Sequence, residues 1–184
     1  NAMWRYLSTE KEIEKNRIII SSFAIIIISG IFITGFLLLF KNALINILNL
    51  EAKDNLIFYV LGSCFLRAIS NFIYWLLQYK NKALSYLILS LTQFISLIGF
   101  TIYFIIGAES GVIGIYYAKI IVFSVLLFAT IFFLLKTIPE MPSIMVIKKL
   151  LSYGLPIIPL ILLMPVLTVS DRYFLQIYSS VEEI

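Results

Sequence analysis

Residues 18–40 read IIISSFAIIIISGIFITGFLLLF, an apolar run without a single charged side chain that ends at Lys41. A helix needs about 20 consecutive apolar residues to cross the hydrocarbon core of a bilayer, which is about 30 Å thick. The run meets this length and therefore predicts a transmembrane helix.

Three further apolar runs follow the first along the chain. Residues 83–106 carry no charge at all. Residues 55–79 are interrupted only by Arg67, and residues 111–135 only by Lys119. Each run is long enough to span a bilayer, so the sequence predicts four transmembrane helices up to residue 135.

A fifth and weaker apolar segment covers residues 153–176 and is broken by Pro156, Pro159 and Pro165. Pro156 can sit in a first helical turn without cost, but an interior proline bends a helix. Discontinuous helices in transporters commonly mark a moving element. We therefore expect a bend near Pro165 and a gating role in which one of two charged residues exchanges partners. These two are Asp171 and Arg172, which are also compatible with a position at the membrane interface.

The composition is typical of a membrane protein. Hydrophobic residues make up 61% of the 184 residues and charged residues only 13%. Soluble domains are about 45–50% apolar and about 25% charged, and a soluble fold of this size could not bury the excess. The predicted fold class is an all-α integral membrane bundle of about five transmembrane helices.

Several kinds of function are excluded by residues that the chain lacks. It has no histidine and a single cysteine, Cys64, which excludes a nitrogen- or sulfur-rich metal site and histidine-dependent catalysis. It also lacks the glycine-rich loops that bind nucleotide phosphates. The net charge of +4 is spread over loops, so nucleic acid is not expected as a partner. We predict neither an enzyme nor a cofactor, and any transport should be secondary or passive.

Polar segments flank the apolar ones. Residues 1–2 read like the remnant of a cleaved tag. Residues 3–17 are charged and are expected to enter the run at residues 18–40 as a helix. Residues 136–152 are expected to form a basic loop, and residues 177–184 an external end.

Basic residues are distributed unequally between the two sides of the predicted bundle. Alternating helices place nine on the side of the N-terminus and two on the other side. The nine are Arg5, Lys11, Lys15, Arg17, Lys80, Lys82, Lys136, Lys148 and Lys149, and the two are Lys41 and Lys53. Loops rich in Lys and Arg stay in the cytoplasm, so the N-terminus is expected there.

Arg67 is the leading candidate for a functional side chain, because a charge at the centre of a transmembrane helix costs at least about 2.5–3.5 kcal/mol. Its polar neighbours at helical spacing are Ser63, Ser70, Asn71, Tyr74 and Gln78. One side of this helix should therefore face protein or water. We predict that Arg67, Asn71, Tyr74 and Lys119 line a cavity. The stripe is also compatible with hydrogen bonds between helices, the role expected of Gln93, and Lys119 with snorkelling toward the surface.

Two motifs carry a resemblance to a known family. The stretch LSYGLPIIP at residues 151–159 is followed by SDRYFL at residues 170–175. This pairing resembles the start of the seventh helix in O-antigen and capsule flippases. These are polysaccharide biosynthesis proteins of the multidrug, oligosaccharidyl-lipid and polysaccharide exporter superfamily. WRY at residues 4–6, Arg67 and GVIG at residues 111–114 are similar too.

The resemblance implies a two-lobed transporter of a bacterial plasma membrane, of which this chain covers about helices three to seven. The implied function is to flip undecaprenyl diphosphate-linked oligosaccharide across that membrane for the synthesis of surface polysaccharide. The expected partners are the lipid bilayer, this lipid-linked oligosaccharide and the second lobe of the parent protein. Arg67 would pair with the diphosphate, since guanidinium binds phosphate oxygens bidentately.

Two other interpretations stay open. The chain could be a structural or assembly subunit whose polar stripe only packs helices. It could also belong to a drug or metabolite exporter of the same superfamily. Such an exporter should hold cations with acidic residues at membrane depth, and only Asp171 offers one.

Overall fold

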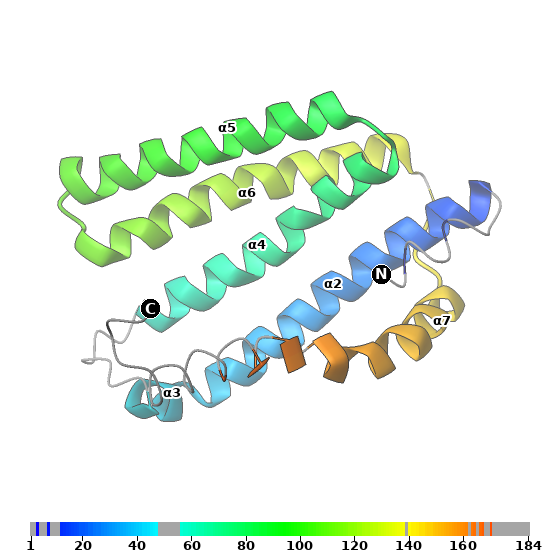
Figure 1. Ribbon diagram of the computed structural model, residues 1–184, viewed down its shortest axis with the longest axis horizontal. Coiled ribbons are helices and arrows are strands. Elements are labelled where there is room, and N and C mark those ends of the chain that lie inside the picture. Colours follow the sequence, from blue (N-terminus) through cyan, green and yellow to red (C-terminus); the bar gives the residue numbers. More distant parts are fainter. Residues whose placement is uncertain are drawn as a thin grey trace, which may run out of the picture. The chain divides into compact units, whose positions relative to one another are not determined.

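The computed structural model describes residues 3, 7, 12–47, 56–138, 140–161, 163, 164, 166, 167 and 170. Within these residues the chain is helical, and no strand occurs among them (Figure 1). Five helical stretches are long and apolar enough to cross a membrane, namely Glu14–Leu39, Leu56–Tyr79, Ala83–Gly107, Gly111–Thr137 and Ile144–Ile161. The predicted helical class, and the number of helices that could span a membrane, are confirmed.

The elements begin close to where the apolar runs begin. They are α2 (Glu12–Leu39), α3 (Lys41–Ile47), α4 (Leu56–Tyr79), α5 (Ala83–Ile102), the π-helical turn η1 (Tyr103–Gly107), α6 (Gly111–Thr137), α7 (Ile144–Gly154) and the 3₁₀ turn η2 (Leu155–Ile157). As expected, the charged residues 12–17 enter the first apolar run as a helix. The short helix α3 was not expected from the sequence.

The chain divides into two compact units. The larger unit, residues 23–140, contains most of α2 and all of α3 to α6. The smaller unit combines residues 1–22 with residues 141–184, and therefore contains the start of α2, α7 and η2.

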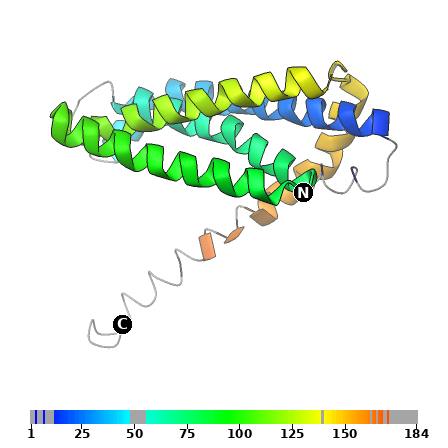
Figure 2. The ribbon, with the colours of Figure 1, turned by 90° about the horizontal axis from the view of Figure 1, so that it is seen from above.

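In the larger unit, α6 packs along both α4 and α5 (Figures 1 and 2). Its core cluster consists of Val122, Phe123 and Leu126, against which Leu66, Leu89 and Leu97 pack. Two contacts give the relative direction of α4 and α6. Tyr59 pairs with Tyr117 near the start of both helices, and Ser70 contacts Phe123 further along. The two helices are therefore parallel, as required when α5 returns between them.

The helix α5 presents an apolar surface suited to contact with lipid along its whole length. It has no buried residue, and Leu91, Phe94 and Ile95 are each more than half exposed. A soluble protein would rarely leave so much contiguous apolar surface uncovered. In a bilayer, lipid chains cover such a surface without cost, which agrees with a membrane protein.

The turn between α4 and α5 is fixed by local hydrogen bonds. The amide of Lys82 donates to the carbonyl of Leu77, and the amide of Asn81 donates to that of Gln78, both at 3.0 Å. Asn81 takes the left-handed conformation with φ of 53°, which asparagine tolerates better than most residues. This pattern is a Schellman motif, and it reverses the chain within three residues.

Lys80 in this turn is held against the end of α6. Its ammonium nitrogen lies 5.1 Å from the centre of the Phe133 ring. Burial, followed by the nearby charge of Lys82, lowers the pKa of Lys80. The turn between α4 and α5 is therefore tied to α6 by a cation–π contact.

Gly114 of α6 allows a close approach of the π-helical turn η1. A Cβ atom at this position would lie 2.9 Å from the Cβ of Phe104, 3.1 Å from its carbonyl carbon and 3.2 Å from its carbonyl oxygen. Two of these atoms belong to the backbone and cannot rotate away. The helix pair therefore requires glycine here.

We expect Gly114→Ala to destabilise the larger unit by about 1–3 kcal/mol, the usual cost of overpacking. Thermal unfolding in detergent, followed by circular dichroism, measures the effect. Gly99→Ala is the matched control, because a Cβ on Gly99 meets nothing within 4 Å. Equal melting temperatures for the two variants would contradict the close packing at Gly114.

In the smaller unit, α7 packs on the start of α2. The backbone amide of Ser143 donates to the hydroxyl oxygen of buried Ser21 at 3.1 Å, which fixes the chain just before α7. Leu150 of α7 and Ile18 of α2 are both buried, at 5% and 4% exposure. These contacts hold two segments together that are more than 100 residues apart in sequence.

The helix α7 lies where a basic loop was expected at residues 136–152. Lys148 and Lys149 favoured a loop, but Ile144, Ile147 and Leu150 recur at helical spacing and form an apolar stripe. The fifth apolar helix therefore begins at Ile144 instead of residue 153.

Pro156 consequently lies in the interior of this helix and not in its first turn. The backbone tightens there into the 3₁₀ turn η2 and then continues as a helix to Ile161. Proline has no amide hydrogen to donate, so a local departure from α-helical bonding is expected. Pro165, where the larger bend was predicted, lies outside the described residues.

Candidate functional site

The polar stripe of α4 is divided between two faces of the helix. On the packed face, the Ser63 hydroxyl donates to a backbone carbonyl one turn earlier at 2.8 Å. The Ser70 hydroxyl lies 2.7 Å from the carbonyl oxygen of Leu66 and 2.8 Å from that of Phe123 on α6. These two serines satisfy their hydroxyl groups inside an apolar interface, as polar residues between membrane helices do.

Tyr74 also belongs to the packed side of α4. Its hydroxyl donates to the side-chain oxygen of Gln93 on α5 and lies 3.5 Å from the carbonyl oxygen of Leu89. Its ring packs edge-on against Tyr86, with 5.4 Å between ring centres. Tyr74 thus joins α4 to α5, and Gln93 makes the interhelical hydrogen bond expected of it.

The other part of the stripe is mostly exposed. We define the outward face of α4 as Cys64, Arg67, Asn71, Trp75 and Gln78. Four of these side chains are exposed and that of Asn71 is half-buried. Arg67 makes no hydrogen bond or ion pair with any residue that the structure describes.

Because of the position of Arg67, contact of this face with lipid is energetically unfavourable unless the face meets polar groups. Arg67 is the twelfth of the 24 residues of α4. At 1.5 Å per residue it lies about 16 Å from the start of the helix, close to the middle of a core about 30 Å thick. A guanidinium there requires water, another polar protein surface or an anionic ligand.

Lys119 lies on α6 and is not brought together with Arg67. Its side chain is half-buried, and its ammonium nitrogen lies 5.0 Å from the centre of the Tyr116 ring, one turn nearer the start of the helix. This is the direction expected for a snorkelling lysine. Among the described residues, no contact joins Lys119 to Arg67. These two cationic side chains therefore do not form one site.

Three predicted site residues cannot be placed. Pro165, Asp171 and Arg172, which were assigned to a gating element, lie outside the described residues.

A polar cavity in the smaller unit was not expected from the sequence. It is bordered by Glu14 and Arg17 of α2 and by Lys149 of α7, and its volume is about 190 Å³. The signal that could have revealed it is the helical spacing of apolar residues around Lys148 and Lys149, which indicates an amphipathic helix.

Comparisons with protein-family models, with curated proteins and with solved structures find no match to this chain. The resemblance to oligosaccharide flippases therefore rests on the sequence motifs alone.

Proposed function

We propose that this chain is part of a secondary transporter that flips undecaprenyl diphosphate-linked oligosaccharide across a bacterial plasma membrane. In this proposal it belongs to the first lobe of a two-lobed protein, with its N-terminus in the cytoplasm. The outward face of α4 lines the central cavity, and the second lobe closes that cavity from the other side.

The observation that carries the proposal is the exposed Arg67 at membrane depth. A helix that only packs within a bundle would bury or pair such a charge, whereas the Arg67 side chain is exposed and makes no hydrogen bond or ion pair with the described residues. Asn71 and Gln78 on the same face add groups that hydrogen-bond sugar or phosphate oxygens. A guanidinium binds phosphate oxygens in a bidentate manner, so an anionic lipid diphosphate suits this face.

The charges of the apolar helices favour an anionic substrate over a cationic drug. None of the stretches 18–39, 56–79, 83–107, 111–137 and 144–161 contains Asp or Glu. They contain Arg67, Lys119 and Lys136, together with the lysine pair near the start of the last stretch. A cavity lined by these helices would attract anions and repel organic cations.

Disruption of the gene for this chain tests the proposal directly. We expect loss of surface polysaccharide and accumulation of undecaprenyl diphosphate-linked oligosaccharide inside the cell, with unchanged sensitivity to cationic drugs. Mass spectrometry of extracted lipids measures the accumulated intermediate. Normal surface polysaccharide with increased drug sensitivity would instead point to an exporter.

A structural or assembly role is the second candidate, and the packed half of the α4 stripe favours it. Ser70 and Tyr74 connect α4 to α6 and α5 and need no ligand. A purely structural role predicts that substitutions of Ser70 or Tyr74 are more harmful than substitution of Arg67. Transport of an anionic lipid predicts the reverse order.

A further inference from the structure

Trp75 is the aromatic residue of the outward face of α4. Its side chain is 45% exposed. Its ring also packs in an edge arrangement against the ring of Phe72, which is fully buried, with 6.5 Å between the ring centres. The indole is therefore supported from within the protein while a large part of its surface stays open.

The support of Trp75 extends to α2. The ring of Phe72 lies 5.1 Å from that of Phe23 on α2. A Cβ atom on Gly30 of α2 would lie 2.8 Å from two ring atoms of Phe65. At about 100° per residue, Trp75 lies about 60° around α4 from Phe72. The indole is therefore next to the side of α4 that contacts α2, and it belongs to a packed helix instead of a loop.

Two amide side chains flank the indole. Asn71 lies four residues before Trp75 and Gln78 three residues after it, and residues at these spacings are neighbours on a helix surface. An aromatic ring has a partly negative face, which attracts the weakly positive C–H groups of a sugar ring. Amides both donate and accept hydrogen bonds, as sugar hydroxyl groups require. An open indole between two amides therefore suits a sugar.

The depth of Trp75 alone is compatible with an anchor at the membrane interface, where tryptophan is enriched. Trp75 is the twentieth of the 24 residues of α4, close to the end of the helix. An anchor, however, lies on a side of its helix that contacts lipid. Trp75 shares its side with Arg67, and a charge at membrane depth makes that side the least suited to lipid. We therefore assign the indole to a ligand of the outward face.

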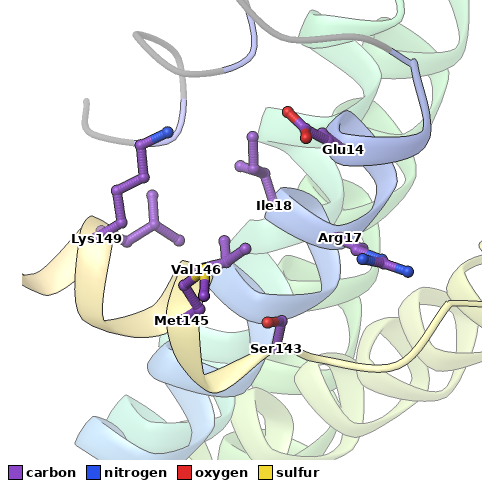
Figure 3. Close-up of a pocket in the computed structure, with 8 residues that line it drawn as sticks. Glu14, Arg17, Ile18, Ser143, Met145, Val146 and Lys149 are labelled. Atoms are coloured by element: carbon purple, nitrogen blue, oxygen red, sulfur yellow. The ribbon is translucent and has the colours of Figure 1, made fainter.

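The polar cavity of the smaller unit does not offer a second site for the same ligand (Figure 3). The Arg17 guanidinium points away from Lys149, and the Glu14 carboxylate lies on the side of Lys149. Glu14 and Lys149 also interact with other groups in the structure. No pair of cations converges on this cavity, so the outward face of α4 stays the place where an anionic group and a sugar can bind together.

We infer that Trp75 is the residue of the outward face that stacks on a sugar of the lipid-linked oligosaccharide. This inference rests on the proposed function, in which Arg67 binds the diphosphate. Trp75 lies about 12 Å further along the axis of α4, so the sugar chain runs from Arg67 toward the end of the helix. Asn71 and Gln78 bond to its hydroxyl groups. In the proposed orientation that end is cytoplasmic, so the sugar is held on the side from which it is loaded.

Fluorescence of the indole tests the contact directly. The chain has two tryptophans, Trp4 and Trp75, so the variant Trp4→Phe leaves Trp75 as the sole indole. The purified variant is reconstituted in nanodiscs and titrated with two probes. One is undecaprenyl diphosphate, and the other is the same lipid carrying a disaccharide of N-acetylglucosamine. The disaccharide lipid should shield Trp75 from quenching by acrylamide, whereas the bare lipid should not. Equal shielding by both lipids would assign the indole to lipid contact and overturn the inference.

Substitution of Trp75 gives a second measurement, in which retained lipids are counted by native mass spectrometry. Trp75→Leu keeps an apolar side chain but removes the ring. It should lower retention of the disaccharide lipid about fivefold to tenfold, as expected for one aromatic contact, and leave the bare lipid unchanged. Trp75→Tyr keeps a ring and should keep most of the preference for the disaccharide lipid.

Phe94→Leu is the matched control, because it removes a 61% exposed aromatic ring from α5. It should retain both lipids as the wild type does. The same loss in Phe94→Leu and Trp75→Leu, or an equal loss of both lipids in Trp75→Leu, would overturn the inference, because both results indicate a general effect of aromatic residues on the membrane.

Arg67→Ala separates this inference from the proposed function. It should lose both lipids, because both carry the diphosphate. Loss of both lipids in Arg67→Ala together with an unchanged preference in Trp75→Leu would leave the anion-binding face in place and overturn the sugar contact alone. A wild-type chain that retains neither lipid would overturn the proposed function and the sugar contact together.

Discussion

Under the proposed function, Arg67→Ala should lower the export of lipid-linked oligosaccharide by about tenfold to a hundredfold. A hydrogen bond to a charged group contributes about 1.5–3 kcal/mol, and every 1.4 kcal/mol corresponds to a factor of ten. The amount of protein in the membrane should be unchanged or higher, because a charge at the helix centre is costly to keep. Export is measured as surface polysaccharide per transporter molecule.

Two further variants sharpen this expectation. Arg67→Lys keeps the positive charge but cannot bind two phosphate oxygens in a planar fork, so it should restore export only in part. Cys64→Ala changes the same outward face without removing a charge and should export normally. Full export by Arg67→Ala would remove the main support for an anion-binding cavity on α4.

The second large effect is expected in a test of membrane topology. In such a labelling experiment a thiol is either almost fully labelled or almost fully protected. The exposed Cys64 is first replaced by alanine. A cysteine in place of Met141, which is 84% exposed, should then be almost fully protected from a membrane-impermeant thiol reagent in intact cells. The expectation follows from the nine basic residues on that side of the bundle against two on the other.

Ala108→Cys is the matched control, because Ala108 is exposed in the turn at the opposite end of α5. It should be labelled from outside without breaking the cells. Permeabilised cells should label both variants equally, which shows that both thiols react. Labelling of the Met141 variant and protection of the Ala108 variant in intact cells would reverse the proposed orientation.

The apolar helices were predictable because they depend on length and hydropathy alone. The starts of α4, α5 and α6 lie within one residue of the predicted starts. Charged residues were the weaker guide. Lys148 and Lys149 favoured a loop, yet both are exposed on a helix whose buried residue is Leu150. A charge pair shows where the polar side of a segment lies, but not whether that segment is helical.

From the sequence, the candidate site could be predicted only as a set of polar residues on one side of α4. At 100° per residue, Ser63, Ser70 and Tyr74 cluster about 60° away from Arg67, Asn71 and Gln78. Sequence spacing places all six on one broad side of α4 but cannot show where the neighbouring helix ends. In the structure, Ser70 bonds to α6, Tyr74 bonds to α5 and Ser63 is buried and bonds within α4, whereas the other three lie on the outward face.

The three-residue Schellman turn between α4 and α5 has a consequence for biogenesis. A connection this short leaves the translocon little chance to release α4 into lipid before α5 has emerged from the ribosome. The two helices are therefore expected to leave it together as a helical hairpin, already joined by the bond from Tyr74 to Gln93. The more apolar α5 then accompanies the helix that carries Arg67 into the membrane, so the charge of Arg67 need not partition into lipid alone.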